Sequence, residues 1–296
     1  MNKLPNFDVI IIGGGLAGLT NAIHLSKFNR QVLLIEKDSY PKHKVCGEYI
    51  SNEVLPYLNS LGIDPINEGA KQITEVQVST TKGNLIKAKL PLGGFGMSRY
   101  FLDNLLIKKA QLNGVQVLKD SVDSIVFENE VFTVRTKDSK SYQSKITIGA
   151  FGKRSKLDLK MNRKFIKKKS PYLAVKIHVE GNFPENLIAL HNFKGGYCGV
   201  SKVENNSINL CYITDYKSFK KFKTISEFQK QVVFKNKHLK KIFEETNPVF
   251  KKPLTISQIS FETKNPVENH IIMCGDTAGM ICLLYTSDAA DEVACV

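Results

Sequence analysis

The sequence has no hydrophobic run long enough to cross a membrane, because no stretch reaches the ~18 consecutive apolar residues that a spanning helix needs. Residues 1–5 lead directly into an expected strand and leave no room for a signal peptide. We therefore expect a cytoplasmic protein. The 42% hydrophobic and 24% charged content are typical of a folded globular chain rather than a disordered one.

Paired cysteines are also missing. The cysteines are scattered without any C-x-x-C pair, which argues against a zinc site and against a disulfide framework. We expect reduced, isolated thiols and no bound metal. The six cysteines are Cys46, Cys198, Cys211, Cys274, Cys282 and Cys295.

Arginine is scarce although the formal net charge is +14, since only five of the 42 basic residues are arginine. Recognition of bases and phosphates by paired hydrogen bonds favours arginine over lysine. The abundance of lysine and asparagine is instead typical of an AT-rich genome. We therefore predict no nucleic-acid partner.

What the chain does contain is a glycine motif between a strand and a helix. The apolar run over residues 7–12 is typical of a buried parallel strand. Gly13, Gly15 and Gly18 follow it in G-x-G-x-x-G spacing, and Glu36 closes the next expected strand. The motif alone is weak evidence, but this context is the one that a dinucleotide-binding βαβ unit requires.

Each motif residue has its own expected role. Gly13 makes the tight turn, Gly15 lets the backbone approach a pyrophosphate, and Gly18 lets the helix pack closely on the strand. At Leu16 and Ala17 the helix begins, so free N–H groups and the helix dipole favour the phosphates there.

The second expected strand, over residues 31–36, completes the unit. Glu36 is placed to accept hydrogen bonds from ribose hydroxyls. Lys37, the next residue, is included in the predicted nucleotide site.

The rest of the chain alternates between two patterns. Expected elements that return to the first sheet include a helix over 99–113, a hairpin over 124–136 and strands over 115–118, 144–150 and 270–274. From residue 172 to 213 apolar and polar residues alternate, which predicts an antiparallel sheet with one covered face. An amphipathic helix is expected over about 225–243.

Four segments, in order, resemble the geranylgeranyl reductase group of flavoproteins, within the superfamily that includes the FAD-dependent aromatic hydroxylases. They are residues 9–18, Pro-Lys-His-Lys-Val-Cys-Gly-Glu at 41–48, Arg-Tyr-Phe-Leu-Asp-Asn-Leu-Leu at 99–106, and Gly-Asp-Thr-Ala-Gly at 275–279. The resemblance extends to Ile281 and implies an FAD-dependent oxidoreductase.

The resemblance also assigns roles to five residues. It implies that Arg99 contacts the phosphates or ribose of FAD, that Asp276 holds the ribityl chain, and that Gly275 is also part of the cofactor site. It places Cys46 and Gly47 near the isoalloxazine ring. The Cys46 thiol is then a candidate to donate a proton or to tune the flavin; the other interpretation is a small residue packed under the cofactor.

The expected fold is α/β, with a Rossmann-like FAD-binding domain and a second, smaller α+β substrate domain that contains an antiparallel sheet. The FAD-binding domain is expected to be discontinuous, over 1–52, 96–160 and 266–281. The substrate domain is expected over 53–95 and 161–265.

One position departs from the family pattern. Residues 149–152 are Gly-Ala-Phe-Gly, where many relatives have Gly-Ala-Asp-Gly. In the hydroxylases this aspartate assists the binding of FAD and NADPH, so Phe151 puts direct use of NADPH in doubt. The electron donor is therefore left open between NAD(P)H and another reduced carrier.

The resemblance implies a reductase of carbon–carbon double bonds in an isoprenoid or similarly apolar molecule as the first hypothesis. The alternative is a monooxygenase that acts on an aromatic or polyketide-like substrate. A halogenase ranks third, because the tryptophan-bearing motif of that group cannot occur in a chain without tryptophan. The further alternative is an inactive, truncated fragment.

Two segments, residues 153–169 and residues 282–296, stand out by their charge composition. Residues 153–169 hold nine basic residues and one acid, which suggests either a solvated loop or peripheral contact with an anionic membrane. Residues 282–296 lack basic residues, and their first eleven can be back-translated into the transposase end of a common sequencing-library adapter. We therefore expect that tail to be non-native, and the true C-terminal part to be missing.

Overall fold

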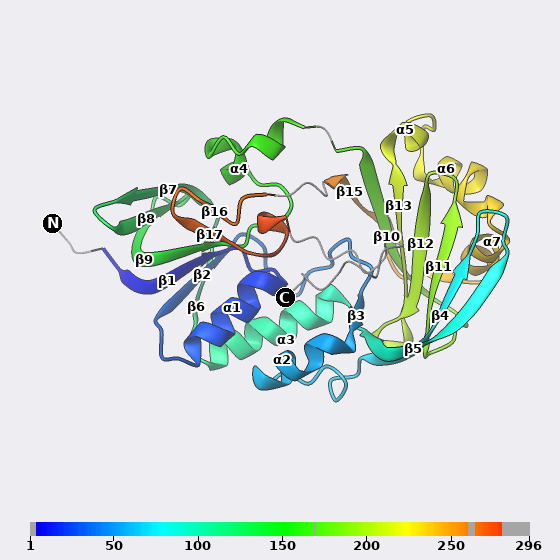
Figure 1. Ribbon diagram of the computed structural model, residues 1–296, viewed down its shortest axis with the longest axis horizontal. Helices are drawn as coiled ribbons and strands as arrows, with labels where there is room; N and C mark the ends of the chain where they lie inside the picture. Colours follow the sequence, from blue (N-terminus) through cyan, green and yellow to red (C-terminus); the bar gives the residue numbers. More distant parts are fainter. Residues whose placement is uncertain (1–3, 169, 260–263, 280–296) are drawn as a thin grey trace.

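The structure is a computed structural model and describes residues 4–168, 170–259 and 264–279. The predicted non-native tail lies outside these residues. Two β-sheets dominate the molecule and stand next to each other, the first on the left and the second on the right of Figure 1. No helix in the described ranges is both long and apolar enough to cross a membrane.

The first sheet has a parallel centre, in which β1 lies between β2 and β9. Its strands are rich in isoleucine, leucine and valine and are buried on both faces, as expected for parallel strands. The eight strands found among the described residues are β16 (Val267–Glu268), β17 (Ile271–Met273), β9 (Ser141–Gly149), β1 (Asn6–Ile12), β2 (Val32–Glu36), β6 (Gln116–Lys119), β8 (Val131–Thr136) and β7 (Val122–Glu128).

Helices α1 (Leu16–Ser26) and α3 (Arg99–Leu112) pack against each other and cover one face of this sheet (Figure 1). Leu19 and Ile23 of α1 and Leu106 of α3 are fully buried in the cluster that this packing forms. The helix predicted over 99–113 is thereby confirmed. Of the short helices in this half, α4 (Lys156–Lys160) packs on the opposite face of the sheet. The others are η1 (Asn52–Val54), α2 (Leu55–Ser60), η2 (Lys164–Lys167) and η5 (Gly275–Ala278).

The second sheet is antiparallel apart from one pair, β11 with β4, which is parallel. Parallel neighbours cannot be joined by a hairpin and need a crossover connection. Here the chain between the two strands passes through the first sheet before it returns to the second. Its nine strands in the described part are β14 (Asn247–Pro248), β10 (Tyr172–Glu180), β13 (Ile208–Asp215), β12 (Gly196–Lys202), β11 (Leu187–Phe193), β4 (Lys71–Ser79), β5 (Leu85–Gly96), β3 (Tyr49–Ser51) and β15 (Leu254–Ile259).

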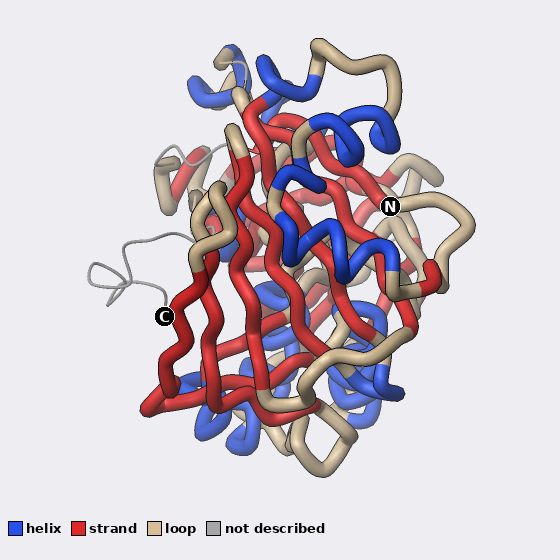
Figure 2. The backbone as a smooth tube through the Cα atoms, turned by 90° about the vertical axis from the view of Figure 1, so that its right-hand side faces the viewer, coloured by secondary structure: helices blue, strands red, loops and turns tan. Residues whose placement is uncertain are grey.

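Helices lie across the outer face of the second sheet, as Figure 2 shows from that side. The prediction of a single helix over 225–243 is wrong. The first helix ends at Val232, whose φ of −124° is not helical, and a new helix begins after Asn236. The Asn236 side chain accepts hydrogen bonds from His238 N and Leu239 N, and so caps the new helix. The elements here are α5 (Tyr216–Phe219), α6 (Ile225–Gln231), η4 (Val233–Lys235) and α7 (Lys237–Glu244), whereas η3 (Glu204–Asn206) contacts the start of α3 through Glu204 and Ser98.

The prediction of one covered face on this sheet is also wrong. Along β10 the apolar face of Leu173 and Val175 packs under α6 and α7. The opposite face is buried too, since Lys176 is 0% exposed and His178 is 4% exposed. The polar face of the strand therefore lies against the first half of the molecule, where it finds partners that are described below.

Candidate functional site

The glycine turn after β1 is built so that only glycine fits. Gly13 has a φ of +107°, and a Cβ atom there would lie 2.2 Å from the carbonyl oxygen of Ala150. A Cβ atom on Gly18 would lie 1.9 Å from the carbonyl oxygen of Gly13. The turn therefore brings the start of α1 into close contact with β1 and with the end of β9.

The space in front of this helix start is open. A Cβ atom on Gly15 would come within 4 Å only of Arg99 Nη2, at 3.8 Å. Gly15 is the N-cap of α1 and supplies no side-chain cap. The first N–H groups of a helix have no partner within it, so those at Leu16 and Ala17 are suited to bind an anion. This open cradle fits the phosphates of a dinucleotide.

Glu36 is held in a fixed position at the end of β2. Its Oε2 accepts a hydrogen bond from Gly14 N at 2.6 Å, and its Oε1 accepts one from Asp38 N at 2.8 Å. A carboxylate has about four acceptor positions, so it keeps the capacity to bind ribose hydroxyls. Lys37, the next residue, is exposed.

Arg99 lies beside the turn and is held by a buried carboxylate. Asp103, 1% exposed, accepts hydrogen bonds from Arg99 Nε and Nη2 at 2.8 and 3.0 Å, and from Lys44 Nζ at 2.8 Å. Burial lowers the pKa of Arg99, but Asp103, and then Cys46 and Asp276, raise it more. The net direction is upward, and the guanidinium is permanently charged.

The segment that carries Cys46 and Gly47 is attached to the second sheet. Asn209 Nδ2, on β13, donates hydrogen bonds to the carbonyl oxygens of Cys46 at 3.2 Å and Gly47 at 2.6 Å. Cys211 on the same strand lines a small cleft with Gly47. Burial, and then the nearby Cys46, raise the pKa of Cys211 to about 12, so that thiol is neutral.

Gly275 and Asp276 come to the same region from the far end of the chain. Gly275 has a φ of +57°, and a Cβ atom there would lie 2.9 Å from Cβ of Ala17. Thr277 Oγ1 accepts a hydrogen bond from Gly152 N at 2.8 Å, which ties η5 to the loop after β9. The structure thus brings the glycine turn, Arg99, Cys46 and Asp276 into one neighbourhood, whereas Lys37 makes no such approach.

A buried ionic cluster beside this neighbourhood was not predicted. The Glu48 side chain is 0% exposed and accepts hydrogen bonds from Lys176 Nζ, from His178 Nε2 at 2.6 Å and from Arg99 N at 2.8 Å. Glu48 has a left-handed backbone (φ +59°), a strained conformation that is concentrated at functional sites. The one available signal in the sequence was a polar Lys-x-His pair inside an otherwise apolar strand.

His43 covers this cluster on the side of the 41–48 segment. Its ring stacks on Tyr100 (centroids 4.4 Å apart) and meets His178 edge-on at 5.2 Å. Burial, followed by the charges of His178 and Lys176, lowers the pKa of His43 to about 4. The His43 ring is therefore neutral at pH 7.

The basic run over 153–169 is not a uniform surface. Arg163 is 1% exposed and donates hydrogen bonds to Asp158 Oδ1 at 2.9 Å and to the carbonyl oxygen of Thr277 at 2.9 Å. It also pairs with Glu268. This arginine therefore holds η5 in place beneath the candidate site. Contact of the run with a membrane stays a prediction.

Comparison with known proteins identifies the family. Residues 7–174 match the family described as pyridine nucleotide-disulphide oxidoreductase. The chain belongs to this family. An uncharacterized protein of Methanosarcina barkeri is 32% identical over 161 residues, which make up 51% of this chain and 39% of that protein. FAD-dependent monooxygenase cdmI of Talaromyces verruculosus is 28% identical over 55% of this chain and 36% of its own length.

Among solved structures, the flavin-dependent brominase Bmp2 has a TM-score of 0.77 at 19% identity, covering 92% of this chain and 72% of that one. A geranylgeranyl bacteriochlorophyll reductase-like protein of Thermoplasma acidophilum has a TM-score of 0.72 at 17% identity, covering 94% and 73%. At such identities the likeness shows the shared fold alone.

The family assignment confirms the prediction of an FAD-dependent oxidoreductase with a Rossmann-like fold. The narrower geranylgeranyl reductase group is not confirmed, since its solved representative shows only a common fold. The matched part spans less than half the length of the two curated relatives named above. These comparisons therefore do not assign a substrate, an electron donor or a reaction type to this chain.

Proposed function

We propose that the chain binds FAD along the line from Glu36 to Asp276, and that it reduces a carbon–carbon double bond of an isoprenoid or similarly apolar substrate. The observation that carries this proposal is the convergence of the glycine turn, Arg99, Cys46 and Asp276. These residues are far apart in sequence, and together they suit the two ends of one dinucleotide.

Each part of the site has a task in this proposal. The α1 N-terminus and Arg99 hold the diphosphate, because N–H groups and a charged guanidinium both favour negative oxygen. Glu36 accepts hydrogen bonds from the ribose, and Asp276 from the ribityl hydroxyls. The proposed division into an FAD-binding part (1–52, 96–160, 266–281) and a substrate part (53–95, 161–265) follows from this arrangement.

Glu36→Ala tests the ribose contact. We expect FAD to bind about tenfold to a hundredfold more weakly, because hydrogen bonds to a charged acceptor contribute about 1.5–3 kcal/mol. Titration of the FAD-free protein measures this. Asp8→Ala is the matched control, since Asp8 Oδ2 accepts a hydrogen bond from Gln31 N at 2.8 Å at the other end of the same strand pair. Equal FAD affinity in both variants would mean that Glu36 does not contact the cofactor.

When bound and reduced, FAD supplies the hydride for the double bond. Reduction then needs one proton at the neighbouring carbon, and this chain must deliver it. Cys46 is the proposed donor, because its thiol lies close to Arg99 and Cys211 at the boundary between the two sheets. The proton is replaced from water. The apolar substrate is expected to reach this boundary beside the second sheet.

Cys46→Ser tests the proton donor. We expect turnover to fall by about a hundredfold, which is in the range that a positioned general acid contributes, while thermal unfolding changes little. Cys274→Ser is the control, because Cys274 is also a half-buried thiol next to the first-sheet core. If both variants turn over like the parent chain, Cys46 is only a packing residue.

A monooxygenase of an aromatic or polyketide-like substrate is the second candidate. It is favoured by similarity to the FAD-dependent monooxygenases spyC and cle3, which are 29% and 32% identical over 55% and 53% of this chain. Phe151, in place of an aspartate, favours a reduced carrier over direct use of NADPH in either case.

Oxygen consumption decides between the two reactions. The FAD-loaded protein is reduced with dithionite and supplied with a model apolar alkene or a model phenol, with and without air. A reductase oxidises its cofactor anaerobically in the presence of the alkene and forms a saturated product. Oxygen-dependent hydroxylation of the phenol would instead establish the monooxygenase and reject the reductase.

A further inference from the structure

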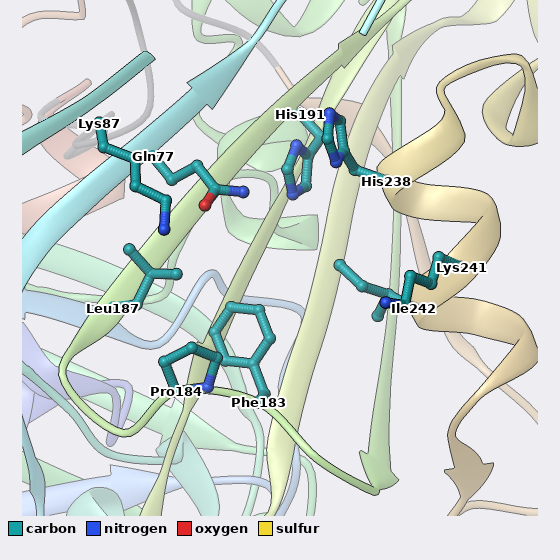
Figure 3. Close-up of a pocket in the computed structure, with 9 residues that line it drawn as sticks. All are labelled: Gln77, Lys87, Phe183, Pro184, Leu187, His191, His238, Lys241 and Ile242. Atoms are coloured by element: carbon teal, nitrogen blue, oxygen red, sulfur yellow. The ribbon is translucent and has the colours of Figure 1, made fainter. Parts of the chain in front are cut away.

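A cleft of about 180 Å³ opens on the outer face of the second sheet, between the sheet and α7 (Figure 3). On β11, Leu187 and His191 point to this face, together with the apolar cluster under α6 and α7. On β10, Lys176 and His178 point to the opposite face, toward Glu48. The cleft is therefore separated from the proposed FAD site by the thickness of the sheet.

His191 supplies a buried hydrogen-bond donor to this cleft. Asn236 Nδ2 donates to Ser79 Oγ at 2.8 Å, so the hydroxyl hydrogen of Ser79 is free to point at His191 Nδ1, also 2.8 Å away. The ring hydrogen of the neutral histidine is then on Nε2. That atom is buried and has no hydrogen-bond partner among the described residues.

Burial supports this neutral form. Burial, and then the nearby His238, lowers the pKa of His191 to about 4. The two rings stack with centroids 5.3 Å apart and can be seen side by side at one end of the cleft in Figure 3. A buried N–H group without an acceptor costs free energy, so this end of the cleft favours a ligand that brings an acceptor oxygen.

The rest of the lining adds charge and an apolar wall. Lys87 and Lys241 are exposed and lie at the rim. Leu187 lies on the same side as Lys87, Ile242 lies beside Lys241 on α7, and Phe183 lies at the end away from the histidines, as Figure 3 shows. The cleft is smaller than the ~300–1,000 Å³ of sites for drug-sized ligands, so it suits one ring or a short chain.

We propose that this cleft binds a small carboxylate with an apolar body, such as an aromatic or short aliphatic acid. One carboxylate oxygen accepts the hydrogen bond of His191 Nε2, and the two lysines attract its charge. The apolar body lies against Phe183, Leu187 and Ile242. This site does not depend on the proposed redox reaction, because it lies on the other face of the sheet.

Benzoate is the probe, and benzamide is its neutral isostere. We expect saturable binding of benzoate to the full chain by ligand-observed NMR, about tenfold tighter than benzamide because the partly screened attraction to both lysines is lost. FAD should leave this binding unchanged. Absence of saturable benzoate binding, or equal affinity for both probes, would overturn the proposal.

Lys241→Gln and Lys240→Gln form a matched pair of variants on α7. Each lysine has an i,i+4 partner at 3.9 Å, Glu245 and Glu244 respectively, but only Lys241 lines the cleft. We expect about fivefold weaker benzoate binding for Lys241→Gln and none of this loss for Lys240→Gln. The same affinity in both variants would show that benzoate binds elsewhere, and so would reject the site.

Discussion

Glu48→Gln is expected to lower the free energy of unfolding by about 3–5 kcal/mol, the usual cost of breaking a buried ion pair. The variant keeps the size of the side chain but removes its charge. Lys176 and His178 then lose the carboxylate to which both donate hydrogen bonds inside the protein. Urea unfolding followed by circular dichroism measures the difference.

Two further variants make this result specific. Glu185→Gln removes an exposed carboxylate that pairs with Lys71 and Lys202, and we expect no measurable loss. Combining Glu48→Gln with Lys176→Met removes both charges and should recover part of the stability, because the unpaired ammonium is gone. A Glu48→Gln protein as stable as the parent chain would mean that this cluster is solvated.

The same cluster is expected to make the stability of the protein decrease at acid pH. Burial raises the pKa of Glu48, but the hydrogen bond from His178 and the charge of Lys176 lower it more, so the net direction is downward. A carboxylate whose pKa is lower in the folded state adds stability above its unfolded pKa, and this is lost as the pH falls through the folded value. His43, whose pKa is lowered to about 4 in the folded state, adds a further loss of stability. This loss starts near pH 6.5, where the unfolded chain begins to bind a proton at this residue. Stability should therefore fall from about pH 6.5 downward, and less steeply in Glu48→Gln.

Gly13→Ala is expected to abolish FAD binding and to cost about 3 kcal/mol or more of stability. Two causes act together, since the φ of +107° is strained for alanine and the new Cβ would overlap the carbonyl of Ala150. That carbonyl belongs to the backbone and has no flexible side chain that could move away. FAD titration and urea unfolding measure the two effects separately.

Gly15→Ala is the control for this prediction. The new Cβ would meet only Arg99 Nη2 at 3.8 Å, so the fold has room for it. We expect parent-like unfolding but weaker FAD binding, because the methyl group stands where the backbone must approach the phosphates. If Gly15→Ala binds FAD as tightly as the parent chain, the phosphates do not pass in front of this helix.

The sequence predicted the βαβ unit well because every part of that signal is local. An apolar strand, three glycines at fixed spacing and Glu36 lie within one short stretch, and each has a steric or hydrogen-bonding reason. The buried cluster could not be predicted in this way, since Glu48 meets partners 128 and 130 residues further along the chain. Alternation placed Lys176 and His178 on one face but could not say what covers that face.

Other differences between the sequence-based predictions and the structure also arise from contacts between residues that are distant in sequence. The break between α6 and α7 depends on Asn236, whose side chain is also fixed by Ser79 on a distant strand. The roles of Asp103 and Arg163 likewise depend on contacts that only the folded chain makes. By contrast Cys46, Arg99 and Asp276 were selected by resemblance, and the structure brings them beside the glycine turn.

The Glu48 cluster also constrains how the molecule can move. Glu48 precedes β3 and belongs to the segment that leaves the first sheet, while Lys176 is in the middle of the second. A hinge motion that separated the sheets would have to pull these charges apart before water reached them. Charges that are parted but still buried are costly, so this step would make a hinge opening slow. Substrate is therefore expected to enter by local movement of loops along the seam, with the two halves moving as a single rigid unit.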